Sequence, residues 1–165
     1  MPVAADLFRR VLGSFASGVT VVTTHADGRA HGTTMTAFCS LSLDPPLVLV
    51  CVDKSAEIHK LIERGGIFAV NILHAGQTEL SRALARKGTP DLAAAHRLEN
   101  VPHHVGKTGA PVLNDHLAYL ECRVLQAIEA GDHTIYVGQV EDGGVTREAE
   151  GPLVYYRGRY RKVTD

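Results

Sequence analysis

Residues 31–52 constrain the fold of this chain more than any other segment, because they place strand-forming residues on both sides of a proline turn. The segment reads HGTTMTAFCSLSLDPPLVLVCV. Proline has no backbone N–H and restricts the residue before it, so Asp44-Pro45-Pro46 ends one strand and Leu47–Val52 begins the next. Leu47–Val52 is apolar on both faces, which predicts a central strand. The small hydroxyl residues before the turn allow a planar heterocycle to approach the backbone, with the second strand as a rigid base.

Short β-branched runs separated by turns dominate the rest of the chain. Val19–Thr24 and Ala30–Phe38 predict a hairpin across Asp27-Gly28. From Ala118 onward, apolar residues recur at every second or fourth position, which predicts a long half-buried strand. Further strands are predicted for Ile67–Leu73, Thr134–Val140 and Leu153–Tyr156. The pattern favours a mainly β fold, a closed or partly closed antiparallel barrel with a few short peripheral helices, with a parallel α/β sheet as the alternative.

Three short helices are predicted. Asp6 is expected to cap the first, and Ser55 is expected to be the N-cap of the second, which ends at Gly65-Gly66. The apolar residues of the first helix are Leu7, Phe8, Val11 and Leu12. The third covers Gln77–Arg86, and the segment Lys87–Val112, which is rich in Gly, Pro and His, is interpreted as an excursion over the surface.

Length and charge limit the class of protein. The chain has 165 residues, of which 45% are hydrophobic, so it can bury one core but is short for two domains. We therefore expect a single domain over residues 1–165. Lys and Arg total 17 against 18 Asp and Glu, giving a formal net charge of -1, so a nucleic-acid partner is not expected. Any site that binds an anion must then depend on a few neighbouring groups and not on the net charge of the protein.

The cysteines and the N-terminal residues indicate the cellular compartment in which the protein is expected. Cys39, Cys51 and Cys122 lie in apolar patterns and form no Cys-x-x-Cys pair, which is typical of a reduced protein. The first residues, MPVAADLFRR, have neither a basic leader nor an apolar signal core, and no apolar run reaches the roughly 18 residues that span a bilayer. We expect a cytoplasmic protein without a membrane span.

Five ordered motifs together resemble the short-chain flavin reductases, the small reductase components of two-component flavin-dependent monooxygenases. They lie at Phe15–Thr24, Gly32–Ser42, Pro46–Val50, Ala69–Leu73 and Gly131–Thr134. The likeness runs from about Phe8 to Tyr160 and is weakest between Lys87 and Val112. It implies an FMN-binding split β-barrel, a homodimer, and reduction of FMN or FAD by NADH or NADPH for a separate oxygenase. The alternative is a non-catalytic split-barrel protein that binds or carries flavin.

The resemblance assigns the opening segment to the flavin. It places Thr34, Met35, Thr36 and Ala37 at the edge of the flavin ring, where hydroxyl and N–H donors can stabilise negative charge on the reduced ring. Ser40 is expected along the ribityl chain. The alternatives are an ordinary Thr-rich strand and a serine that bonds backbone groups near the turn.

Lys54, Ser55 and Ala56 are the candidate site for the flavin phosphate. They lie where a strand ends and a helix begins, so an ammonium, a hydroxyl and a helix N-terminus can meet one anion. The charge of Asp53 would oppose a phosphate, so its side chain is expected to point outward. The alternative is that Ser55 only caps the helix and Lys54 is solvated.

Two further residues are assigned by position in the family. Asn71 interrupts an apolar strand, and its amide needs partners, which are either the flavin or neighbouring backbone; the resemblance favours the flavin. His133 is placed near the nicotinamide as the catalytic candidate, where it can orient the dinucleotide or assist protonation. The alternative for His133 is a turn-capping pair with Asp132.

Two other types of site are weighed against this. A hydrolase built from Ser40, Asp132 and His133 lacks a Gly-x-Ser-x-Gly elbow, and adjacent residues do not readily form a relay. A metal site at His103, His104 and His116 lacks the i, i+4 helical spacing of a ligand pair, so no metal is expected. The tyrosines near the C-terminus, Tyr155, Tyr156 and Tyr160, fit either a cofactor cover or the core.

Overall fold

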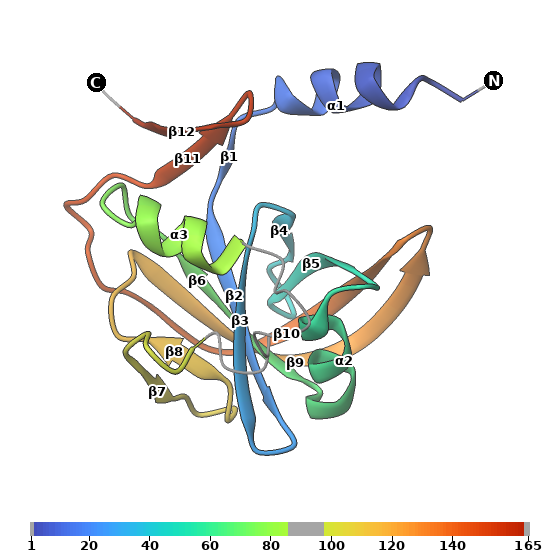
Figure 1. Ribbon diagram of the computed structural model, residues 1–165. Helices are drawn as coiled ribbons and strands as arrows, with labels where there is room; N and C mark the ends of the chain where they lie inside the picture. The colour runs from blue at the N-terminus through green and yellow to red at the C-terminus, as the bar shows by residue number, and fades with distance from the viewer. Residues whose placement is uncertain (1, 86–97, 164–165) are drawn as a thin grey trace.

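A seven-stranded antiparallel sheet forms the body of the protein (Figure 1), whose computed structural model describes residues 2–85 and 98–163. The strand order is β3-β2-β6-β9-β10-β5-β4. The strands are β2 (Thr20–Ala26), β3 (Arg29–Met35), β4 (Phe38–Ser42), β5 (Leu47–Asp53), β6 (Ile67–Ile72), β9 (Ala118–Ala130) and β10 (His133–Val145). Every neighbouring pair is antiparallel, so the mainly β class is confirmed and the parallel alternative is wrong.

Two smaller sheets complete the β structure of the described residues. One joins β1 (Ser17–Gly18), β11 (Leu153–Tyr156) and β12 (Arg159–Lys162), and the other pairs β7 (His103–Val105) with β8 (Pro111–Leu113). The predicted hairpin of β2 and β3 is confirmed, and the predicted strand at Leu153–Tyr156 pairs with β12 in a second hairpin. Strands β7 and β8 fall in the segment that the sequence assigns to a surface excursion, of which residues 86–97 lie outside the described part.

The helices are α1 (Ala5–Gly13), α2 (Glu57–Gly65) and α3 (Thr78–Ala85). The N-caps of α1 and α2 are Ala4 and Ala56, without side-chain capping bonds, so Asp6 and Ser55 are not the caps that the sequence predicts. The end of α2 is confirmed, because Gly66 takes the left-handed conformation with φ 64°, which favours glycine. Within residues 2–85 and 98–163, none of the helices has the length and apolar character needed to cross a bilayer.

Strand β5 departs from its predicted central place. It lies between β10 and β4, and β4 is an edge of the sheet. Its valines at 48, 50 and 52 are buried, whereas the alternating residues are only half-buried. The strand therefore has one face on the core and one face that is available to a site.

The main core lies between the sheet and α2. Phe68, Val50, Ile58 and Ile62 pack together there, each fully removed from solvent. Burying such apolar side chains is the main favourable term in folding. This packing fixes α2 beside the end of β5, where the sequence expects an anion site.

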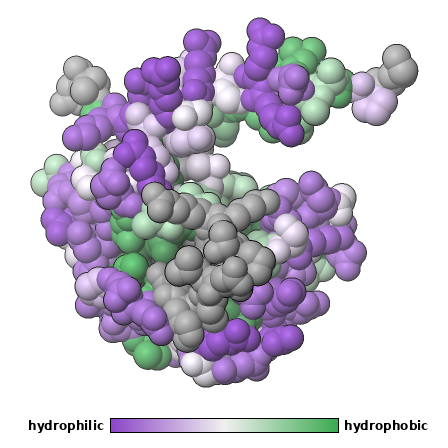
Figure 2. All heavy atoms as spheres, viewed as in Figure 1, coloured by the Kyte–Doolittle hydropathy of each residue, from purple (hydrophilic) through white to green (hydrophobic). Residues whose placement is uncertain are grey.

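Helix α1 differs from the other two helices because none of its residues is buried. It projects from the body beside β1, β11 and β12, and Figure 2 shows open space between this helix and the sheet. Its exposed apolar residues are Leu7, Phe8, Val11 and Leu12. A helix that is amphipathic yet unburied presents an apolar stripe to its surroundings.

Candidate functional site

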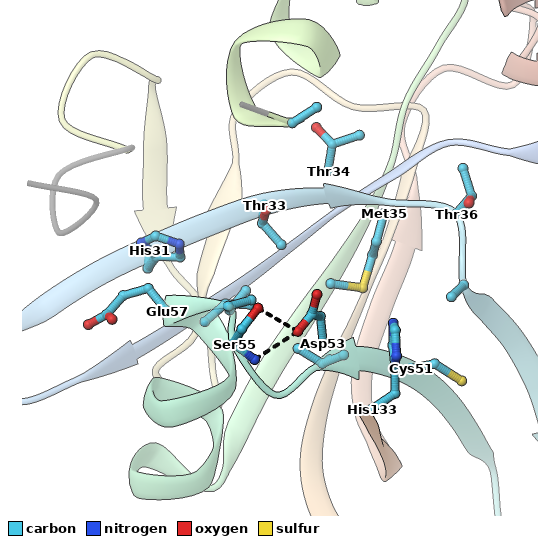
Figure 3. Close-up of a pocket in the computed structure, with 15 residues that line it drawn as sticks. His31, Thr33, Thr34, Met35, Thr36, Cys51, Asp53, Ser55, Glu57 and His133 are labelled. Carbon is cyan, nitrogen blue, oxygen red and sulfur yellow. Dashed lines mark hydrogen bonds between the residues drawn. The ribbon is translucent and has the colours of Figure 1, made fainter. Parts of the chain in front are cut away.

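A cavity of about 570 Å³ lies between β3, the end of β5, the start of α2 and the first residue of β10 (Figure 3). That volume is within the usual range for pockets that bind small molecules and cofactors. The structure places Thr34, Met35, Thr36 and Ala37 in its wall, together with Ser55, Ala56 and His133. Residues almost a hundred positions apart in sequence are thus brought to one cavity.

The threonines of this wall have different hydrogen-bonding partners. The Thr34 hydroxyl donates to the carbonyl oxygen of Ser81 at 2.7 Å, and the Thr33 hydroxyl donates to that of Leu84 at 3.2 Å. Both bonds fix β3 to α3 and leave these oxygens only as acceptors for a ligand. Thr36 is exposed, and its hydroxyl makes no hydrogen bond to any described residue. Thr36 is therefore the wall hydroxyl with a proton to offer.

Asp53 points to the cavity, not outward as the sequence predicts (Figure 3). Its Oδ1 accepts hydrogen bonds from the backbone N–H and the hydroxyl of Ser55, both at 2.7 Å. The backbone N–H of Ala56 donates to the Asp53 carbonyl at 3.0 Å, which closes the turn before α2. Ser55 is consequently held by Asp53, which explains why it does not cap the helix.

Lys54 does not line the cavity. Its ammonium group donates to Glu129 on β9 at 3.0 Å, and this bond lowers the pKa of the Glu129 carboxyl. The bond to Glu129 directs the Lys54 side chain to β9, whereas Asp53 and Ser55 line the cavity. The predicted phosphate site thus keeps Ser55 and Ala56 but not the ammonium.

His133 is the first residue of β10 and lies opposite Asp53 in the β10–β5 register. Its Nδ1 donates to Asp132 Oδ1 at 2.7 Å, and this bond lowers the pKa of the Asp132 carboxyl. The ring lines the cavity and remains partly exposed. The turn-capping pair therefore exists, and it orients an imidazole at the mouth of the site.

Ser40 lies elsewhere. It is exposed on the edge strand β4, opposite Val48, and does not line the cavity. The predicted ribityl contact has no support in this arrangement. A hydrolase of Ser40, Asp132 and His133 is equally unsupported, because the serine does not share the cavity with the histidine.

Asn71 is a correction to the predicted site. It is fully buried on β6 and does not line the cavity. Its Nδ2 donates to the carbonyl of Val21 at 3.0 Å and to the hydroxyl of Thr23 at 3.2 Å, and its Oδ1 accepts from the N–H of Leu113 at 2.9 Å. The amide is thus satisfied by the protein, and its role is to join β2, β6 and β8.

Several lining residues were not found from the sequence. His31 is almost fully buried on β3, Glu57 lies in the first turn of α2, and Cys51 and Ala85 complete other parts of the wall. His31 is two residues before Thr33, so strand alternation could have placed both on one side. Glu57 carried no such signal, because its position depends on how α2 packs.

The described part of the cavity wall carries negative charge. Asp53 and Glu57 supply two carboxylates, and none of the described lining residues is Lys or Arg. Across residues 2–85 and 98–163, no group of three or more His, Cys, Asp or Glu side chains is arranged to hold a metal ion. His116 instead uses both ring nitrogens on the carbonyl of Leu113 and the hydroxyl of Thr146.

Several proteins whose names state an activity are similar to this chain in sequence or fold. The chain is 40% identical over 163 residues to a flavin reductase (NADH) of Kitasatospora aureofaciens, covering 97% of this chain and 82% of the relative. It is 39% identical to the reductase component of a 4-nitrophenol 4-monooxygenase/4-nitrocatechol 2-monooxygenase of Rhodococcus opacus, covering 93% and 78%. The structure of the NADH:FAD oxidoreductase SgcE6 of Streptomyces globisporus matches with a TM-score of 0.90 at 35% identity, over 100% of this chain and 96% of that one.

The family model described as "Flavin reductase like domain" matches residues 12–164, which include all the strands of the seven-stranded sheet and every lining residue described above. The predicted resemblance is confirmed, and this chain belongs to the flavin reductase like family.

Proposed function

We propose that this protein uses NADH or NADPH to reduce FMN or FAD and supplies the reduced flavin to a separate oxygenase. One observation carries the proposal: the cavity joins the wall of residues 34–37 to His133 within the matched family domain. The names of its relatives support the same activity, since they include NADH-dependent FAD and FMN reductases and a monooxygenase reductase component.

The residues present fit a flavin. Thr36 offers a hydroxyl proton, the small Ala37 lets a planar ring approach the backbone, and the half-buried Met35 supplies an apolar surface. Ser55 and Ala56 lie at the start of α2, where the helix dipole favours an anion such as the flavin phosphate. We therefore assign Thr34 to Ala37 to the ring and Ser55 with Ala56 to the phosphate, and omit Ser40, Lys54 and Asn71.

The bound flavin supplies hydride acceptance, so the chain itself needs no redox group. What the protein contributes is placement. His133, fixed by Asp132, is positioned to hold the nicotinamide at the cavity mouth. Holding two reactants in reacting geometry lowers the barrier by removing the entropy of bringing them together.

We also propose that the protein is a homodimer. Phe8, Val11, Leu12 and Phe15 are 51%, 61%, 54% and 79% exposed in the single chain, and all lie on or beside α1. Monomeric proteins rarely leave large apolar side chains grouped in this way. A second copy packed against α1 would cover them. Light scattering on the purified protein measures the mass directly, and a monomer at micromolar concentration would contradict the proposal.

The activity is tested by following NADH or NADPH absorbance with catalytic protein and excess FMN or FAD. Flavin-dependent loss of that absorbance is the expected result. Loss with no flavin added, or no loss with either dinucleotide, would contradict the reductase. Tight flavin binding without turnover would instead support the flavin-carrier alternative.

A further inference from the structure

We propose that Asp53 weakens the binding of the flavin phosphate, so that the cavity binds FMN hardly more tightly than riboflavin. The inference rests on the proposed function, because it concerns how the same cavity treats the same ligand. It assigns a role in ligand specificity to Asp53, whose side chain the sequence predicts to point away from the site.

Asp53 already occupies the donors that a phosphate needs. Its Oδ1 accepts both the backbone N–H and the hydroxyl of Ser55, each at 2.7 Å. An anion at the start of α2 binds through such N–H and hydroxyl donors. A phosphate oxygen that approached Ser55 would have to displace the Asp53 carboxylate. Because Asp53 is only two residues from Ser55 in the chain, its carboxylate competes with the phosphate at a high effective concentration.

The charges around the cavity act in the same direction. Asp53 and Glu57 both line the wall, and no described lining residue is Lys or Arg. The nearest ammonium in sequence, on Lys54, is bonded to Glu129 at 3.0 Å. Arg and Lys are the groups with which proteins usually hold phosphate. Among the described lining residues a phosphate therefore meets carboxylates and no Lys or Arg, so we expect most of the binding free energy to come from the ring.

A consequence is that the phosphate adds little to affinity. Riboflavin and FMN differ only in the phosphate, so the ring contacts proposed for the lining residues Met35 and Ala37 are the same for both. The intact protein should therefore bind the two flavins with nearly equal dissociation constants. Removing the Asp53 carboxylate should favour FMN alone.

The test is fluorescence titration of FMN and of riboflavin with the purified full chain and two variants. Asp53→Asn removes the charge and keeps an acceptor for Ser55, whereas Asp53→Ala also releases both Ser55 donors. We expect FMN to bind about tenfold more tightly to each variant, and riboflavin affinity to stay within about twofold. Glu63→Gln is the matched control, because Glu63 is exposed on α2 and does not line the cavity.

The rate of FMN release gives a second measurement. Displacement of reduced FMN under anaerobic conditions should be slower from both variants than from the unmodified protein and the control. FMN affinity that is unchanged or weaker in both variants, with riboflavin binding retained, would overturn the role of Asp53 and leave the reductase intact. Loss of riboflavin binding in both variants would also overturn it, by showing that Asp53 shapes the cavity. Absence of flavin binding to the unmodified protein would instead contradict the proposed function.

Discussion

In the interior of the sheet, the polar groups of Asn71 and Thr23 bond only to the protein, whereas in the cavity wall Thr36 exposes a hydroxyl that has no partner among the described residues. The Thr23 hydroxyl donates to the carbonyl of Pro111 and accepts from Asn71. Thr23 lies on β2 and Asn71 on β6, whereas Thr36 directly follows β3. We call the first region, formed by Thr23, Asn71 and His116 with the backbone of Leu113, the interior polar cluster.

The difference between the two regions is one of free energy. A buried polar group that loses its partner costs about 1–3 kcal/mol, so the interior polar cluster stabilises the fold only while it is complete. An exposed hydroxyl has no such free-energy cost in the absence of a ligand, because it forms hydrogen bonds with water. Substitutions in the cluster should therefore change stability, and substitutions in the cavity wall should change activity.

The largest effect is expected for Asn71→Ala. The change removes three hydrogen bonds at a site without solvent exposure and leaves the N–H of Leu113 without its side-chain acceptor. We expect the free energy of unfolding to fall by about 4 kcal/mol in urea denaturation, with the flavin dissociation constant unchanged in the folded fraction. Asn114→Ala, at an exposed position bonded to His104, is the control and should change stability by less than about 0.5 kcal/mol.

The outcome that contradicts this assignment is a large loss of flavin affinity with nearly normal stability. That result would return Asn71 to the flavin site.

The second prediction compares two threonines directly. Thr23→Val keeps the shape of the side chain but leaves Asn71 without one acceptor, so we expect a loss of about 2 kcal/mol in unfolding free energy and no change in flavin affinity. Thr36→Val should do the reverse, raising the flavin dissociation constant about threefold at constant stability. Urea denaturation and flavin titration on both variants measure the four quantities. Equal effects of the two substitutions on stability would contradict the division into two regions.

The third prediction concerns His133→Ala. The imidazole is partly exposed and bonds to an exposed aspartate, so its loss should leave stability nearly unchanged. We expect kcat/KM for NADH to fall about tenfold because the nicotinamide is held less well, while the flavin dissociation constant stays the same. His25→Ala is the matched control, since His25 is exposed on β2 outside the cavity. Unchanged kcat/KM would remove His133 from the site.

The sequence predicts the two regions unequally. Hairpins such as β2–β3 are predictable because the alternating residues and the Asp27-Gly28 turn are local. The wall of residues 34–37 follows from the family resemblance and the end of that hairpin. Asn71 is different: its partners lie on β2 and β8, about 40 to 50 residues away in either direction, and no local pattern shows which strands will flank β6.

The same limit explains the errors around Ser55. Sequence proximity groups Lys54 with Ser55, but in the turn that follows β5 Ser55 bonds to Asp53, whereas Lys54 bonds to Glu129, 75 residues later. The sequence predicts that the Asp53 side chain points away from the site, because its negative charge would oppose that of a phosphate. In the folded chain the turn geometry decides, since two short hydrogen bonds from Ser55 hold the carboxylate at the cavity.

The smallest effect is expected for the dependence of the unfolding free energy on pH, to which the interior polar cluster contributes through His116. His116 in the interior polar cluster is 5% exposed, and burial lowers the pKa of its imidazole below the ordinary 6.5. As pH falls through 6.5, the unfolded chain therefore binds a proton before the folded protein does. The unfolding free energy should decrease between about pH 7.5 and pH 5.5. His116→Gln should reduce this slope, as measured by urea denaturation at each pH, whereas His25→Gln should preserve it. Equal slopes in all three proteins would show that the stability of the cluster does not depend on a neutral His116, and that the pH dependence arises outside it.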